Sequence, residues 1–281
     1  MSSQYYDRTY EILVNDQPFI TDKRFRVVFQ VTQDYGGFVS YCDLSIYGLS
    51  DDTIGKINSP NNTVSIKAGY ENNVDFIFKG ILINSQKQRN GPDVFFRIIA
   101  RGGAQTNDSI NQTLGKNTKV TTLIKACADA IGLPLVIKES DFSTEPVYSK
   151  GATLFGDPKQ YLNDLSKTHD FSYVVVNDKI RVTKNTGYID STVQEVSQFT
   201  GMIGIPEITE NGCDVSIIMN PRVKIGGRIN IVSELKTFNF SNVYYRQIPP
   251  NAGSGIYRVF KITHNGDNWT NRWNTQITGF R

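Results

Sequence analysis

Two close pairs of carboxylates are the residues best suited to acid–base chemistry. Glycoside hydrolysis needs a carboxylic acid of raised pKa opposite a second carboxylate. Asp51 and Asp52 directly follow Ser50, and an acidic pair in that place suits the first turn of a capped helix. Glu139 and Asp141 lie in the loop after "LPLVI", where we expect them to face water. Neither pair therefore predicts a hydrolase.

The cysteines and histidines also lack the spacing of a reactive site. Cys42, Cys127 and Cys213 lie far apart without a CxxC pair, so we expect three small buried side chains. Cys127 lies on the apolar stripe of a predicted helix, which favours a core position over a nucleophile. His169 and His264 have no second metal-type ligand nearby in the sequence. The short "GSG" and "GGR" runs lack a following helix, so no phosphate loop is predicted. We expect no enzyme, no metal and no cofactor.

Composition and charge indicate an ordinary folded protein. Of 281 residues, 39% are hydrophobic and 20% charged, and the net charge of +3 is too weak for a general nucleic-acid binder. Residues 211–281 carry a net charge of +6, which fits either a solvated basic surface or a face that docks on an acidic partner. No apolar run approaches the roughly 20 residues that cross a bilayer, and the opening "MSSQYYDRTYEILVND" does not resemble a signal peptide. We expect no membrane insertion, and a protein that is made and kept in a reducing cytoplasm.

Period-2 alternation dominates residues 1–104. "RFRVVFQVTQD" places Phe25, Val27, Phe29 and Val31 on one face, and "VSYCDLSIYGL", "VSIKAGY", "DFIFKGILINSQ" and "VFFRIIARG" read as further strands. "RNGPD" is typical of a hairpin tip. This segment predicts a small antiparallel β-barrel or sandwich.

The period changes in residues 105–195. "NTKVTTLIKACADAIG" carries a helical apolar stripe with an Asn/Thr start, Asn117 and Thr118, and with Gly132 as its stop. "GDPKQYLNDLSKTHD" predicts a helix capped by Asp157, with Pro158 at its first position. "FSYVVVNDKIRVTK" predicts a hairpin, so the segment is an α+β domain. Alternation then resumes over residues 196–281.

The two β segments repeat one another. "CDLSI" at 42–46 matches "CDVSI" at 213–217, "VSIKAGY" corresponds to "RINIVSE", "FIFKGILI" to "IYRVFKIT", and "FFRIIARG" to "WNTQITGF". We expect the Asn90-Gly91 tip to correspond to Asn265-Gly266-Asp267. The alternative to a duplication is that any two β-meanders have similar sequence patterns. A true duplication predicts that three chains present six similar barrels, so that a trimer can meet a hexamer.

The same runs resemble a known family. "DLSIYGLSDDTIGKI…NTVSIKAGY…FIFKGILI" is similar to the N-terminal domain of tail baseplate hub proteins of contractile-tailed bacteriophages, and "GMIGIPEITENGCDVSIIMNPRVKIGGRINI…YRVFKITHNGDNWTNRWNTQI" resembles their C-terminal domain. Related hubs occur in type VI secretion spikes. The resemblance implies a mainly β chain, with two similar tube-like antiparallel β-barrels at 1–104 and 196–281 flanking the α+β domain.

The resemblance also implies the partners. The expected assembly is a homotrimer in the virion tail baseplate that joins the hexameric tail tube protein to a trimeric central spike protein. Other baseplate proteins and the tape measure protein are further expected partners, and DNA would pass through the lumen without specific binding. Nothing after Arg281 continues into a β-helix, so we expect the spike to be a separate protein.

Candidate interface residues follow from apolar edges and long loop tips. They are Phe76, Phe78, Arg89, Asn90, Phe95, Pro249, Pro250, Trp269 and Trp273. The strands that hold the phenylalanines suit an intersubunit edge or burial in their own barrel, and the tryptophans suit either partner anchors or packing beneath their hairpin. The alternative function is a carbohydrate- or cell-wall-binding tail module, with the middle domain as the binder.

Overall fold

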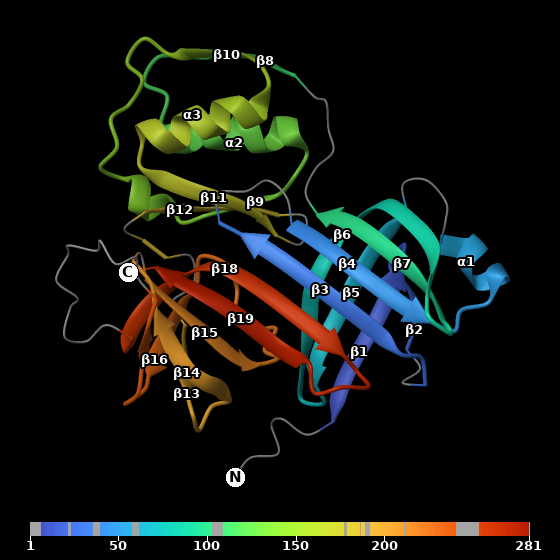
Figure 1. Cartoon of the computed structure of the whole chain (residues 1–281). Coiled ribbons are helices and arrows are strands. Elements are labelled where there is room, and N and C mark those ends of the chain that lie inside the picture. The colour runs from blue at the N-terminus through green and yellow to red at the C-terminus, as the bar shows by residue number, and fades with distance from the viewer. Residues whose placement is uncertain are drawn as a thin grey trace.

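The structure is a computed structural model, and it shows a mainly β chain arranged in three units (Figure 1). It describes residues 7–21, 24–35, 40–57, 62–102, 109–176, 179–185, 187–188, 192–210, 212–239 and 253–280. We call the units N-terminal (β1–β7), middle (β8–β12) and C-terminal (β13–β19). The middle unit lies over the junction of the other two (Figure 1).

The N-terminal unit consists of strands and one short helix. In chain order these are β1 (Arg8–Val14), β2 (Gln17–Ile20), β3 (Val27–Asp34), β4 (Ser40–Tyr47), α1 (Asp51–Ile57), β5 (Thr63–Tyr70), β6 (Asn73–Asn90) and β7 (Asp93–Gly102). As predicted, Val27, Phe29 and Val31 are buried on one face of β3. The Ser50 hydroxyl accepts a hydrogen bond from the Thr53 N–H (3.3 Å), which confirms the cap of α1.

The middle unit is the predicted α+β segment. Its elements are β8 (Ile110–Leu114), α2 (Val120–Ile131), β9 (Leu135–Ile137), the 3₁₀ helix η1 (Glu139–Phe142), β10 (Ala152–Gly156), α3 (Pro158–Thr168), β11 (Phe171–Val176) and β12 (Lys179–Lys184). Asp157 caps α3 by accepting from the Lys159 N–H (2.8 Å), and Gly132 ends α2 at φ 76°. The predicted Asn/Thr start of α2 is wrong, because Lys119 is the N-cap and the Thr118 hydroxyl donates to the Gly115 carbonyl (2.6 Å).

Strand β11 attaches the middle unit to the rest of the chain. The helices lie between the two-stranded β8–β10 sheet and the β9–β12–β11 sheet (Figure 1). Phe171, Tyr173 and Val175 point into the core of the middle unit, whereas Val174 and Val176 belong to the core of the C-terminal unit. Because successive side chains of a strand face opposite ways, one strand contributes to both cores.

The C-terminal unit follows. Its strands are β13 (Val193–Ser197), β14 (Met202–Ile208), β15 (Gly212–Ile218), β16 (Arg228–Val232), β17 (Thr237–Phe238), β18 (Gly255–Asp267) and β19 (Trp273–Phe280). Strand β13 pairs with β16, so the predicted boundary between residues 195 and 196 falls inside a strand of this unit.

The two β units have the same pairing order. Neighbouring strands run β1-β5-β6-β7-β4-β3 in the N-terminal unit and β13-β16-β18-β19-β15-β14 in the C-terminal unit. These strands also follow one another along the chain in the same sequence in both units. One difference is that β1 is antiparallel to β5, whereas β13 is parallel to β16. Similar topology at the two ends of the chain is what the repeat in the sequence predicts.

A matching irregularity extends the correspondence to single residues. The pairing registers place three sets of residues in equivalent positions: Cys42 and Cys213, Ala100 and Gly279, Leu82 and Val259. The next residues, Ile83 in β6 and Phe260 in β18, are both skipped by the register, and both side chains are exposed. A β-bulge at the same place in both units is difficult to explain by a general likeness of β-meanders.

A ladder between β3 and β18 joins the units into one 14-stranded sheet. It is antiparallel and runs from Val28 opposite Asp267 to Asp34 opposite Lys261. Ion pairs lie at both ends, with Arg26 to Asp267 at 2.8 Å and Lys261 to Asp34 at 3.4 Å. Strands β19, β18, β3 and β4 consequently run side by side (Figure 1). Among the described strands no backbone ladder closes either unit on itself.

Trp273 of the C-terminal hairpin is part of the N-terminal core. Its side chain is buried, its ring meets that of Phe29 edge to face at 5.4 Å, and its indole N–H donates to the Gly69 carbonyl (3.2 Å). Met219 lies in the same core. The two ends of the chain therefore share apolar packing as well as a sheet.

The predicted tip at Asn265-Gly266-Asp267 is wrong. These residues are inside β18, and the turn lies at 268–272. Gly266 pairs with Trp273 on one side and Phe29 on the other, and an added Cβ would lie 2.2 Å from the Phe29 ring. The glycine is present for close packing rather than for turning.

Replacing Gly266 therefore tests how much the ladder between β3 and β18 contributes to stability. Gly266→Ala forces the Phe29 ring or the ladder to shift, and we expect a loss of about 1–3 kcal/mol in unfolding free energy. Gly55→Ala in α1 is the matched control, because its added Cβ meets nothing within 4 Å and alanine favours a helix. Urea unfolding monitored by Trp fluorescence measures both, and equal stability of the two variants would contradict this role for Gly266.

His264 of the same ladder predicts a pH dependence. Its ring is buried opposite Val31 and bonds the Thr275 hydroxyl at 2.9 Å; burial, helped by the Lys224 charge, lowers the pKa to about 3. In the unfolded chain a histidine titrates near pH 6.5, so acid favours unfolding from that pH downwards. We expect the unfolding free energy to fall by about 1.4 kcal/mol per pH unit as pH drops from about 6 towards 3.

The ion-paired carboxylates Asp75, Glu145 and Asp267 add no slope between pH 6.5 and 5, because their pKa is lowered in the folded chain and their contribution to stability is lost only in stronger acid. His264→Gln should reduce the dependence of the unfolding free energy on pH in this window. An unchanged slope in the variant would assign the acid sensitivity to another group.

Candidate functional site: the outward face of the shared sheet

The outward face of the shared sheet is polar. Across β15, β19, β18, β3, β4 and β7, side chains that alternate with the core residues point away from both cores. They include Gln30, Thr32, Asp43, Ser45, Arg97, Ser216, Gln276 and Thr278, which are at least partly exposed, and Thr263 and Asn265, which are buried among their neighbours. Two shallow hollows lie on this face, of about 280 Å³ beside Asp43 and Arg97 and about 320 Å³ beside Lys261 and Gln276.

One ion pair and one hydrogen bond to an amide engage arginines of this face. Arg97 binds Asp43 through two hydrogen bonds of 3.0 and 2.6 Å, and this carboxylate raises the pKa of Arg97. Arg272 donates to the Asn265 amide oxygen (2.7 Å). The result is a hydrophilic face of amides, hydroxyls and the Arg97–Asp43 ion pair.

A hollow of about 690 Å³ lies between the middle and C-terminal units. Arg258 stacks on the Tyr35 ring (4.4 Å from its centroid) and donates to the Tyr35 hydroxyl and to the carbonyls of Lys184 (3.2 Å) and Asn185 (2.9 Å). Through these bonds the guanidinium group holds the units together. The side chain is therefore structural rather than a ligand donor.

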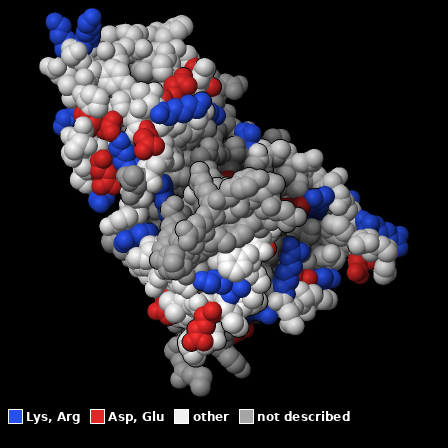
Figure 2. Space-filling view, turned by 60° about the vertical axis from the view of Figure 1, so that its left-hand side comes forward, with Lys and Arg blue, Asp and Glu red and all other residues white. Residues whose placement is uncertain are grey.

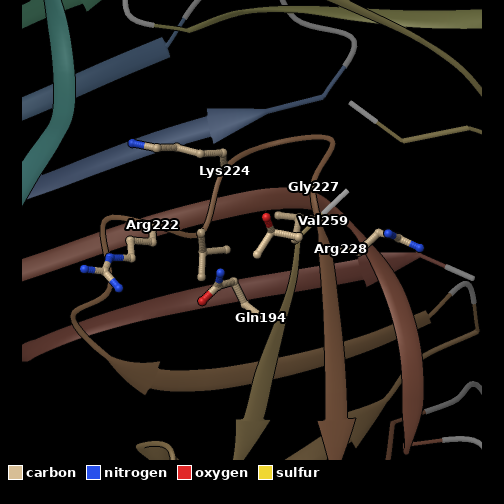
Figure 3. Close-up of a pocket in the computed structure, with 8 residues that line it drawn as sticks. Gln194, Arg222, Lys224, Gly227, Arg228 and Val259 are labelled. Carbon is tan, nitrogen blue, oxygen red and sulfur yellow. The ribbon is translucent and has the colours of Figure 1, made fainter. Parts of the chain in front are cut away.

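A second hollow, of about 440 Å³, is lined by basic side chains that do not converge. Figure 3 shows Arg222 and Lys224 extending towards one side, well separated from each other, and Arg228 extending towards the other. Lys224 instead bonds the Asp75 carboxylate (3.0 Å) and the Phe76 carbonyl (3.3 Å) of β6, and so forms another link between the β units. Arg228 stacks on the Tyr188 ring at 3.6 Å. The arrangement does not form an anion site.

A titratable cluster in the middle unit was missed by the sequence analysis. Glu145 binds the His169 ring (2.7 Å) and Lys184, and the other ring nitrogen of His169 meets the Tyr148 hydroxyl (2.9 Å). Lys184 and His169 lower the pKa of Glu145 against its desolvation, whereas burial and the Glu145 charge raise that of Tyr148. The cluster therefore stays an ion pair with a protonated phenol, which fixes the loop before β10. No sequence motif signals it, because its members come from separate elements.

The residues considered for catalysis do not meet one another. Asp51 bonds Lys87 (2.7 Å), and Asp141 bonds Lys138 (3.2 Å). All three cysteines are buried as predicted, and burial raises the pKa of Cys127 to about 11 and, with nearby acids, that of Cys213 to about 12. These thiols are protonated at neutral pH and poor nucleophiles.

The candidate interface residues fall into three groups. Phe78 and Trp273 are buried, so their side chains are out of reach of a partner. Arg89, Asn90 and Trp269 are exposed, while Phe76 and Phe95 are half-buried beside Lys67 and Tyr47 respectively. Pro249 and Pro250 lie outside the described residues.

Charge is mixed over one broad face of the molecule. Figure 2 shows basic and acidic side chains interspersed there, without a single-sign patch among the described residues in view. Within the described ranges no group of three His, Cys, Asp or Glu side chains could hold a metal ion. None of the helices in those ranges is long and apolar enough to cross a membrane.

The fold is shared with tail proteins. The structure is similar to the tail protein from Neisseria meningitidis MC58 (TM-score 0.62, 8% identity, 98% of this chain and 97% of that one). It is also similar to the 43 kDa tail protein of prophage MuSo2 from Shewanella oneidensis (TM-score 0.61, 7% identity, 98% and 97%). A third similar structure is the E. coli c3393 protein, a component of the type VI secretion system (TM-score 0.54, 7% identity, 96% and 76%).

At this identity the structures establish the fold, and the sequence itself establishes the family. No protein with a curated description matches it. The family model described as "Baseplate hub gp41" matches residues 12–241, which is most of the chain. The polar wall, the duplicated strand order and this match agree, and the chain belongs to the baseplate hub gp41 family, whose members are structural proteins of the phage tail baseplate.

Proposed function

We propose that three copies of this chain form the hub ring of the baseplate, which joins a hexameric tail tube to a trimeric central spike. The observation that carries the proposal is the matched strand order and matched bulge of the two β units. A threefold ring of such chains presents six similar units and can therefore meet a sixfold ring. Each unit would act as a tube-like barrel of the ring.

The proposal assigns the outward face of the shared sheet to the wall of the central channel. Its side chains are hydrophilic, and Arg97 and Asp43 neutralise one another there. DNA would then pass without specific binding, because amides, hydroxyls and a neutralised ion pair attract phosphate weakly. The tail tube protein and the spike protein would contact opposite rims, and other baseplate proteins and the tape measure protein are further partners.

The role is one of assembly rather than catalysis. The family supports a structural part, and the acid–base cluster around Glu145 is held as an ion pair. The middle unit would then brace the joint between the two β units. Val174 and Val176 of β11 pack into the C-terminal core, and Arg258 of β18 donates to the Lys184 carbonyl of the middle unit.

Size-exclusion chromatography with light scattering tests the ring. We expect a particle of three times the 31.6 kDa chain mass that does not bind isolated peptidoglycan. The outcome that would contradict the proposal is a stable monomer at micromolar concentration. If that monomer also bound peptidoglycan, the middle unit would be reassigned as a wall-binding module.

A further inference from the structure

The sequence contains three Asn-Gly pairs, at 90–91, 211–212 and 265–266. In such a pair the backbone nitrogen of the glycine can attack the side-chain amide of the asparagine, because glycine has no side chain that hinders the approach. Asn211 lies outside the described residues. The structure places the other two pairs in opposite surroundings, so the chain holds both a candidate site for this reaction and its control.

Asn90 and Gly91 form the tip of the β6–β7 hairpin. The ladder ends where Asn90 lies opposite Asp93, so Gly91 is in the turn and outside both strands. Both residues of the pair are exposed, Gly91 has a φ of 60°, and a Cβ added to it would meet nothing within 4 Å. The Asn90 amide is therefore open to water and has room to approach the Gly91 nitrogen.

Asn265 and Gly266 are held inside β18. Both are buried, and they pair with β19 on one edge and with β3 on the other. The Asn265 amide oxygen accepts from Arg272 (2.7 Å), and its amide nitrogen lies 3.5 Å from the Gln276 amide oxygen. The Asn265 side chain can reach the Gly266 nitrogen only if both ladders open, and such an opening is rare in a core strand.

We propose that Asn90 is a site of spontaneous deamidation in the folded chain, and that the ladders protect Asn265. The Gly91 nitrogen, after losing its proton to a base, forms a bond to the side-chain amide carbon of Asn90. The bond from that carbon to the amide nitrogen breaks, the nitrogen takes up a proton, and ammonia leaves a cyclic imide. Water then opens the imide at either carbonyl and gives aspartate or isoaspartate. The net reaction consumes one water and releases one ammonia, and no oxidant or reductant takes part.

The reaction changes both the charge and the backbone of the tip. Either product replaces a neutral amide by a carboxylate next to Arg89, whose Nε donates to the Gly91 carbonyl oxygen (3.0 Å). Isoaspartate also lengthens the backbone by one carbon, which disturbs the pairing of residue 90 with Asp93. This inference does not depend on the proposed hub ring.

Mass spectrometry of protein digests tests the proposal. The full chain is incubated in a mildly alkaline buffer, and the conversion of amide to acid is followed in the peptides that hold Asn90 and Asn265. We expect conversion at Asn90 to be at least about tenfold faster, because only Asn265 must wait for local opening. In urea that unfolds the chain the two rates should become similar. Equal rates in the folded chain would overturn the proposal, and so would a difference that persists in urea, since it would come from the local sequence.

A pair of variants assigns the change to one residue. In Asn90→Gln the amide carbon is one bond further from the Gly91 nitrogen, so conversion in this peptide should slow at least about tenfold. Asn84→Gln, an exposed change in the same strand, is the matched control and should leave conversion at Asn90 as it is. Undiminished conversion of the peptide in Asn90→Gln would assign the reaction to another residue and contradict the proposal.

Discussion

The ladder between β3 and β18 is the constraint on which the rest of the structure depends. It joins strands more than two hundred residues apart, and Trp273 and Gly266 lock it by packing against Phe29. Ion pairs of Arg26 with Asp267 and of Lys261 with Asp34 lie at its two ends. Without this ladder the chain would be two separate β units with exposed edges. With it, the two units share one continuous sheet.

That wall explains how a duplicated chain can serve a baseplate hub. Each unit turns its apolar side chains to its own core and its amides, hydroxyls and paired ions outwards, so the joined face is hydrophilic along its length. The middle unit stiffens the arrangement, because Arg258 and Tyr35 bind all three units at one point.

The sequence predicted the elements that depend on local chemistry. The alternation of apolar and polar residues predicted the strands, and Ser50 and Asp157 predicted the helix caps. The two Cys-Asp pairs indicated the duplication. It did not predict that β3 pairs with β18, because periodicity shows which face is buried and not which edge is covered. Asn265-Gly266 was misread as a tip, since a glycine required for close packing has the same local signature as one required for a turn.

The most direct test of the account is a cryo-electron microscopy map of the assembled ring. The account predicts threefold symmetry with six similar β units, and an inner wall in which β18 lies beside β3 within each chain. An inner wall built from other strands, or units that do not superpose, would contradict it.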